Sequence, residues 1–325
     1  MEFKYAISLL FSNMGYVLRI FAWVLISMVV TVCVGAAIMV PVFDALGETA
    51  AVSSAYGAFT SEISAFLDDG ISIRAFVDSV PAAVGDLLTA VASEGGLLAA
   101  LIIELIFLYA LYSFLLSFSY YPTAYSVKQL MSSNMRIGLA SSMALNFKQS
   151  VRFAVCRVSV SVPIDVCLIT LACLLFWGLF TAVGVFAFPI LILAGIAVVS
   201  LRSTFFAGWL PRLLFVQGEC MYTSFGRSLR AVKLNIKGLM KAFVITFFAA
   251  YALVAGLSLP TFGLIVIVVP SLNYFIFRTI ELVGYYKMNG LSFYTDAANV
   301  VDTVEFGYRA ENQYGNSEDN NAGEQ

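Results

Sequence analysis

The chain contains no histidine and few charged residues. The absence of histidine excludes His-ligated metal sites, a Ser-His-Asp triad and an imidazole base. Only 12% of the 325 residues are charged, which is half of the roughly 25% usual in soluble domains. A chain with so little charge cannot cover a surface that faces water. We therefore predict an integral membrane protein.

Motifs of nucleic-acid binding and of catalysis are also missing. The net charge is −2 and there is no long basic tract, which argues against a nucleic-acid partner. We find no P-loop, no nucleophile elbow and no metal-ligand spacing. The five cysteines all lie outside residues 44–96, so no disulfide framework is expected. We expect no cofactor, no metal and no enzymatic activity.

What the chain does contain is long apolar runs. Hydrophobic residues make up 61% of the sequence, and the mean hydropathy is +0.91. A helix that crosses a hydrocarbon core of roughly 30 Å needs about 20 mostly apolar residues. The sequence therefore predicts an all-α, polytopic membrane protein with six transmembrane helices, at about residues 17–42, 97–119, 158–180, 184–205, 241–259 and 261–285.

The first of these spans has an alternative interpretation as a signal peptide. Lys4 precedes it, and the small residues Gly35 and Ala36 lie within it. Its apolar run extends past Val40, which is longer than the 7–15 residues of a typical signal-peptide core. The length favours a membrane span.

The distribution of charge predicts the orientation. Residues 44–96 contain eight acidic residues and one basic residue, Arg74, whereas residues 120–157 contain five basic residues and no acid. Residues 202–241 contain seven basic residues and a single acid, Glu219. Because basic loops stay in the cytoplasm, we predict a multi-pass protein of the cytoplasmic membrane, with both termini cytoplasmic and an external acidic loop at 44–96.

An internal repeat precedes the odd-numbered spans. The segment Ala144–Arg152 resembles Lys233–Lys241, and a fainter copy lies at Ser12–Arg19. We therefore predict three repeats, each made of an amphipathic cytoplasmic helix and a membrane hairpin.

One of these amphipathic helices carries a stripe of basic residues at helical spacing. We predict that the stripe faces the headgroups of anionic lipid or a membrane partner. Alternatively, its basic residues only fix the orientation and snorkel. The stripe consists of Arg227, Arg230, Lys233, Lys237 and Lys241.

Two segments carry a resemblance to known families. The stretch Pro211–Phe243, in which Gly226-Arg227-Ser228-Leu229 opens a basic helix, resembles the membrane domain of glycerophosphoryl diester phosphodiesterases and YciC-like proteins. Pro122-Thr123-Ala124-Tyr125, followed by Asn146–Ser150, is similar to the YesL-like family. The resemblance implies a bacterial inner-membrane helical domain that is not itself catalytic, since the soluble phosphodiesterase domain of the first family has no counterpart here.

Four ionisable side chains lie within the predicted spans, where charge is costly and marks candidate functional positions. They are Glu104, Asp165, Arg278 and Glu281. Their depth allows an Asp165–Arg278 pair between two repeats, or an Arg278–Glu281 pair at i and i+3. Such pairs either hold helices together or line a path for protons or cations. Glu104 has no evident basic partner.

The remaining segments are the acidic loop and the tail. Apolar residues at helical spacing in 44–96 predict two short amphipathic helices, with Pro81 in a first turn. Residues 1–287 form a single six-helix domain in this prediction. Residues 288–325 are expected to be an acidic, largely disordered cytoplasmic tail.

Two functions fit this sequence. The first is a non-enzymatic accessory or scaffold protein that binds the bilayer, anionic lipid headgroups or another membrane protein. The alternative is a small transporter or permease with a charged path through the bundle, in which Pro163, Pro189 and Pro270 interrupt the spans. The small number of polar residues within the spans favours the first.

Overall fold

The protein is almost entirely helical. A computed structural model describes residues 2–68, 70, 72–183, 187–216, 218–295 and 299–301. Contacts divide the chain into two compact units. The bundle unit comprises Met1–Ile26 and Ser113–Gln325, and the hairpin unit comprises Ser27–Tyr112.

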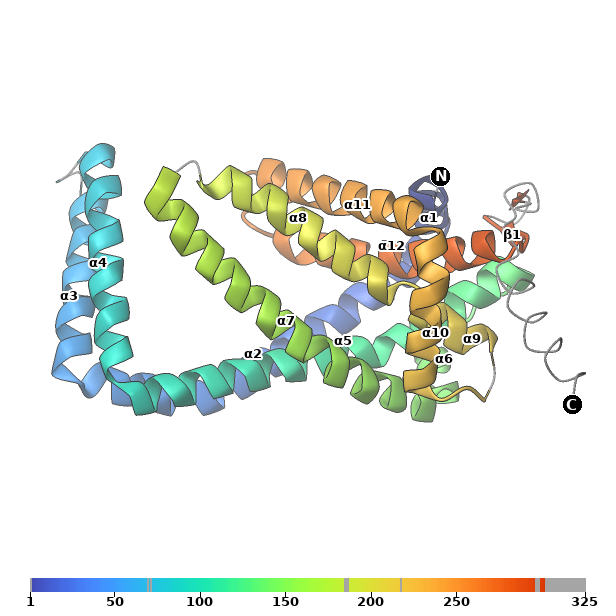
Figure 1. Cartoon of the computed structure of the whole chain (residues 1–325), viewed down its shortest axis with the longest axis horizontal. Coiled ribbons are helices and arrows are strands. Elements are labelled where there is room, and N and C mark those ends of the chain that lie inside the picture. The colour runs from blue at the N-terminus through green and yellow to red at the C-terminus, as the bar shows by residue number, and fades with distance from the viewer. Residues whose placement is uncertain are drawn as a thin grey trace, which may run out of the picture. The chain divides into compact units, whose positions relative to one another are not determined.

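Twelve helices and one pair of short strands make up the described part of the chain (Figure 1). The helices are α1 (Glu2–Ser12), α2 (Met14–Glu48), α3 (Ala50–Leu67), α4 (Ile73–Ser93), α5 (Gly95–Ser133), α6 (Leu139–Leu145), α7 (Phe147–Val183), α8 (Ala187–Phe206), α9 (Trp209–Phe215), α10 (Met221–Leu234), α11 (Ile236–Leu257) and α12 (Ile265–Met288). The strands β1 (Phe293–Tyr294) and β2 (Val300–Val301) pair antiparallel.

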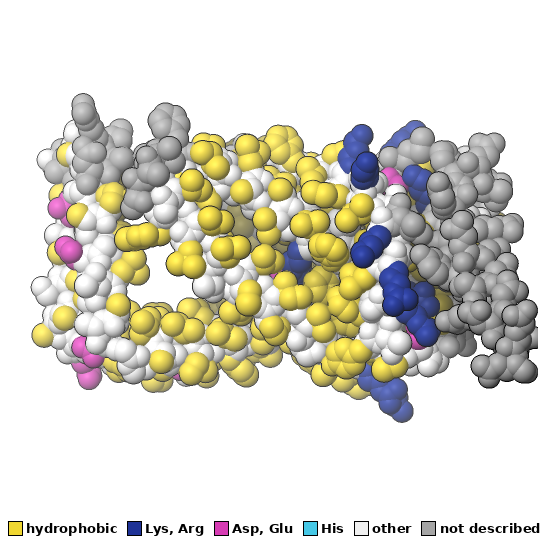
Figure 2. Space-filling model, in the orientation of Figure 1, with side chains coloured by type: hydrophobic (Ala, Val, Ile, Leu, Met, Phe, Trp, Pro, Cys, Tyr) yellow, Lys and Arg dark blue, Asp and Glu magenta, His cyan; other side chains and the backbone are white. Residues whose placement is uncertain are grey.

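Six helical segments are long and apolar enough to cross a membrane in the described part of the chain. They are α2, α5, α7, α8 with α9, α11 and α12. Figure 2 shows hydrophobic side chains along the bundle unit, with Lys and Arg gathered near α10. These six segments confirm the predicted all-α, multi-pass membrane protein, whose apolar helix faces contact lipid.

Several helices extend beyond the predicted spans. The predicted span at 97–119 is part of α5, which continues through Pro122 to Ser133. The extension buries Thr123, Val127 and Met131 in the bundle unit. Similarly, α7 begins at Phe147 rather than near residue 158. A helix continues past its lipid-facing run when its next turns are packed against neighbours.

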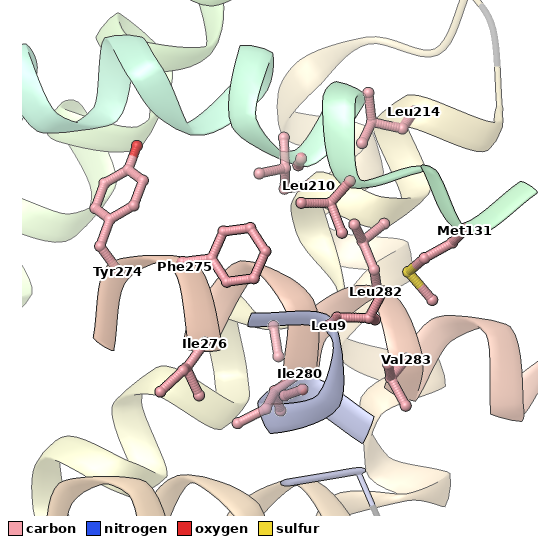
Figure 3. Packing of buried hydrophobic residues seen from close by; sticks show 14 of the residues in the cluster. Leu9, Met131, Leu210, Leu214, Tyr274, Phe275, Ile276, Ile280, Leu282 and Val283 are labelled. Atoms are coloured by element: carbon pink, nitrogen blue, oxygen red, sulfur yellow. The ribbon is translucent and has the colours of Figure 1, made fainter. Parts of the chain in front are cut away.

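Helix α12 is the central helix of the bundle unit. Within its most apolar window 56% of the residues are buried, against at most 22% in the other five segments. Contacts join α12 to α1, α9 and α11. Figure 3 shows this core, in which Leu9 of α1 and Leu210 of α9 pack with Ile280 and Leu282 of α12. Helices distant in sequence are therefore held together by one buried face.

A single asparagine separates each short helix from the span that follows it. The backbone oxygens of Asn13, Asn146 and Asn235 accept the first helical hydrogen bond of the next helix, from Val17, Ser150 and Leu239. The backbone angles of Asn146 (φ −112°, ψ 20°) and Asn235 (φ −122°, ψ 24°) are nearly the same. Asn side chains bond readily to nearby backbone, and those of Asn13 and Asn146 donate to the carbonyl four residues earlier.

The hairpin unit contains the predicted loop, folded as α3 and α4 side by side. The rings of Phe66 and Phe76 stack at 4.3 Å, and Ser79 donates to Glu62. The helices are longer than predicted, and Pro81 lies inside α4 rather than in its first turn. The reason is that Ser72 caps the helix, since its Oγ accepts from the Ala75 amide.

The end of α12 leads into the strand pair. Phe293 of β1 is 1% exposed and packs edge-on against Tyr5 of α1 and Tyr286 of α12. This segment is thus docked on the bundle unit. Residues 296–298 and the rest of the predicted acidic tail, from residue 302 onward, lie outside the described residues.

Candidate functional site

Helix α10 runs crosswise to α8 and α11 of the bundle unit (Figure 1). Its buried side consists of Ser224, Ser228 and Val232, and it packs against α8 and α9. This contact is close at Gly208, the residue before α9. A Cβ at this position would lie 2.8 Å from Val232 Cγ2 and 3.2 Å from the Ser228 carbonyl oxygen. A small residue at this crossing lets the two backbones approach.

The opposite side of α10 carries the basic stripe predicted from the sequence. Its five residues, Arg227, Arg230, Lys233, Lys237 and Lys241, are all exposed. They do not share one continuous helix as predicted, because the helix is interrupted at Asn235, where α10 ends and α11 begins. Lys237 and Lys241 therefore belong to the first turns of α11. We call these five residues the α10 basic surface.

Glu219, in the loop before α10, holds that helix to α9. Its carboxylate accepts hydrogen bonds from Arg212 Nε (2.8 Å), Arg212 Nη2 (3.1 Å) and Arg227 Nη1 (2.8 Å). Hydrogen bonds from Arg212 are the main cause that lowers the pKa of Glu219 below its ordinary 4.5. Glu219 therefore partly neutralises Arg227. The remaining positive charge of the α10 basic surface lies on its other four residues.

Replacing Glu219 with glutamine should remove a pH-dependent part of the stability. A depressed carboxylate pKa stabilises the fold above the unfolded pKa, and this contribution is lost as pH falls through the folded pKa. At neutral pH we expect Glu219→Gln to lower the free energy of unfolding by about 1.5–3 kcal/mol, the range for hydrogen bonds to charged groups. Denaturant titrations at a series of pH values should show the gap closing on acidification.

The matched control is Glu48→Gln, since Glu48 is exposed and has no ion pair among the described residues. It should show no gap at any pH. A Glu219→Gln gap that is constant with pH would contradict the proposed role of the carboxylate.

Asp165 of α7 pairs with Arg202 of α8, not with Arg278 as one prediction had it. Arg202 Nε and Nη2 both donate to the Asp165 carboxylate. Sequence depth placed Asp165 level with Arg278, but contact between α7 and α8 brings Arg202 closer. The charge of Asp165 is thereby neutralised within one helical hairpin.

Arg278 and Glu281 form the second predicted pair, within α12. Arg278 Nη1 lies 2.6 Å from Glu281 Oε2, and the two side chains are 5% and 3% exposed. The guanidinium of Arg278 also lies 4.2 Å from the centre of the Tyr120 ring. The two residues lie about one helical turn apart, and the bundle unit buries both side chains.

Arg157 of α7 joins this cluster and was not predicted as an intramembrane charge. It is 6% exposed, and its guanidinium carbon lies 4.4 Å from the Tyr120 ring centre and 5.3 Å from that of Phe206. Glu281 attracts it and Arg278 repels it. Arg157 was assigned to a cytoplasmic loop because the sequence does not show that α7 begins at Phe147.

Glu104 lies in α5, within the hairpin unit. Its Oε2 atom is buried and makes no hydrogen bond to any residue that the structure describes. Asp165 belongs to the bundle unit. A charged path that includes Glu104 and Asp165, one form of the transporter alternative, therefore stays a prediction.

Two further contacts fasten the ends of helices near α1 and α9. Lys287 donates to Glu2 at 3.0 Å. Burial alone would raise the pKa of Glu2, but a backbone hydrogen bond and Lys287 outweigh it and lower the pKa. Lys128 donates to the carbonyl of Leu214 at 2.8 Å and lies 4.2 Å from the Phe215 ring centre. These charges serve the packing of the bundle unit.

Within the described ranges, no group of three His, Cys, Asp or Glu side chains is placed to hold a metal ion. Comparison with known proteins found no matching family model, curated protein or solved structure. The resemblances drawn from Pro211–Phe243 and from Pro122–Tyr125 with Asn146–Ser150 stay predictions.

Proposed function

We propose that this protein is a non-enzymatic accessory or scaffold protein that binds anionic lipid through the α10 basic surface. The observation that carries the proposal is the position of α10. It runs crosswise to α8 and α11, with its side of small residues packed inward and Arg230 and Lys233 exposed. A helix in this orientation lies in the headgroup layer and directs its bases toward anionic phosphates.

The intramembrane charges support this proposal over transport. Asp165 is engaged by Arg202 and Glu281 by Arg278, so these four groups hold α7 to α8 and stabilise α12. A transport path needs polar groups that exchange partners with a passing ion. We assign the pairs a structural role.

We further propose that the three asparagine junctions mark three repeats. Each would consist of a short interfacial helix (α1, α6 or α10) and a hairpin of two spans. The matching backbone hydrogen bonds at Asn13, Asn146 and Asn235 support this proposal. By the positive-inside rule, the α10 basic surface would face the cytoplasm of a bacterial cell, and both termini would lie on that side.

Neutralising four residues of the α10 basic surface should weaken lipid binding. Each basic residue near an anionic surface contributes about 1 kcal/mol, so Arg230→Gln with Lys233→Gln, Lys237→Gln and Lys241→Gln should reduce retention of phosphatidylglycerol at least roughly tenfold. Native mass spectrometry of the detergent-purified protein, titrated with phosphatidylglycerol or phosphatidylcholine, measures this retention. Arg227 is left unchanged because it bonds Glu219.

The matched control exchanges the same four residues within their charge class, as Arg230→Lys, Lys233→Arg, Lys237→Arg and Lys241→Arg. It should keep the wild-type preference for phosphatidylglycerol, and added salt should weaken both proteins alike. Equal retention by the neutral variant and the wild type would contradict the proposal.

A further inference from the structure

A cavity of about 320 Å³ lies in the bundle unit, away from α10. Its walls are the α1–α2 junction, the last turns of α5 and the segment Arg136–Gly138, and Phe275 of α12 also lines it. Its volume is in the range of small-molecule sites. These walls come from three parts of the chain that are far apart in sequence.

Two arginines line the cavity, and none of the acidic residues that the structure describes does. Arg19 and Arg136 are both exposed, and neither forms an ion pair with a carboxylate in the part of the chain that the structure describes. Arg136 follows α5, whereas Arg19 lies five residues past the start of α2. Guanidinium groups bind phosphate by two parallel hydrogen bonds. The cavity is therefore suited to an anion.

Buried hydroxyl groups lie on the inner wall. Ser126 is only 5% exposed, it lines the cavity, and its Oγ has no hydrogen bond of normal geometry to a described residue. The Tyr16 hydroxyl lies next to the hydroxyls of Ser126 and Thr123, and it too makes no hydrogen bond of normal geometry to a described residue. Buried polar groups are nearly always hydrogen-bonded. A ligand with acceptor oxygens, bound beside the two arginines, would complete the hydrogen bonds of these hydroxyls.

Gly138 shapes the mouth of the cavity. A Cβ at this position would lie 3.0 Å from Arg19 Nη1, so alanine would require the guanidinium to move by a few tenths of an ångström, and a branched side chain would require a larger shift. The backbone of Gly138 has φ −67° and ψ 151°, which every residue adopts. A side chain at Gly138 would therefore take up space that Arg19 needs, without straining the backbone.

We infer that this cavity binds the phosphate group of a phospholipid headgroup. The arginines would hold the phosphate oxygens, and the hydroxyls of Tyr16 and Ser126 would donate to the headgroup. The apolar part of the wall, which includes Val127, Leu130 and Phe275, suits the glycerol and the start of the acyl chains better than it suits a free anion. This inference rests on the proposed function in one respect, namely that the phosphate belongs to a lipid.

The test is native mass spectrometry of the full chain titrated with phosphatidylglycerol. The wild type should retain one phospholipid that resists salt, and Arg19→Gln with Arg136→Gln should weaken this binding at least tenfold. Gly138→Val, which needs more room beside Arg19 than alanine does, should weaken it as well, with both arginines in place. The control, Lys148→Gln with Arg152→Gln, removes two exposed charges outside the cavity and should retain the lipid.

The outcomes separate this inference from the proposed function. Retention of the salt-resistant lipid by the Arg19/Arg136 variant would overturn the inference and leave the α10 proposal standing. Loss of that lipid in this variant, together with unchanged retention in the four-residue α10 variant, would support the cavity and overturn the α10 proposal. Binding of glycerol 3-phosphate or inorganic phosphate as tightly as phosphatidylglycerol would overturn the lipid as its source.

Discussion

Replacing Glu281 with glutamine should destabilise the protein strongly, by about 3–5 kcal/mol, as expected when one partner of a buried ion pair is removed. The change keeps the side-chain shape but leaves Arg278, which is 4% exposed, without its counter-charge. Arg157 would lose the only acid that attracts it in the cluster described above. An unfolding titration with dodecyl sulfate in mixed micelles measures the loss.

The control removes both members of the pair, as Arg278→Met with Glu281→Leu. Buried pairs replaced by apolar residues are often neutral in stability, and the charges of Arg278 and Glu281 act on Arg157 in opposite directions. This double variant should therefore be clearly more stable than Glu281→Gln alone. If the two variants lose equal stability, the buried charge is not the cause.

Trp209→Ala should cost about 3–5 kcal/mol, the range for large aromatic residues in cores. Trp209 is fully buried and packs against Phe153, Phe206 and Phe225, with ring centres 4.7–6.2 Å away. Its indole Nε1 donates to the carbonyl of Met221 at 2.9 Å, which is the first residue of α10. Dodecyl sulfate titration should show the loss, and protease cleavage at α10 should become faster.

Trp177→Ala is the matched control because it makes the same change at a side chain that is 64% exposed. It should alter stability by less than about 1 kcal/mol, since little packing is lost. A similar loss from both substitutions would mean that the aromatic cluster around Trp209 does not anchor α10.

The spans were predictable because a single physical requirement defines them. A run of about 20 apolar residues is visible in any sequence, and α2, α11 and α12 lie where such runs lie. The ends of α5 and α7 were not predictable in this way. Their extra turns, up to Ser133 and from Phe147, are polar enough to resemble loops and become helical because the bundle unit buries one side of them.

The contacts of the charged residues were likewise predictable only in part. The Arg278–Glu281 pair was accessible to prediction because both members lie on one helix at i and i+3. The partner of Asp165 was missed, since sequence depth does not reveal which neighbouring helix is closest. The cavity near Arg19 was also missed, because its walls come from α2, α5 and residues 136–138 and no local pattern connects them.

The asparagine junctions have a consequence for how this chain tolerates insertions and deletions. One residue separates α10 from α11, so the angular setting of the first helix relative to the second depends on the exact number of residues between them. Adding or deleting one residue turns a helix by about 100° and moves it by about 1.5 Å along its axis. Side chains on α10 are therefore freer to vary than the length of the chain near Asn235, and the same restriction applies at Asn13 and Asn146.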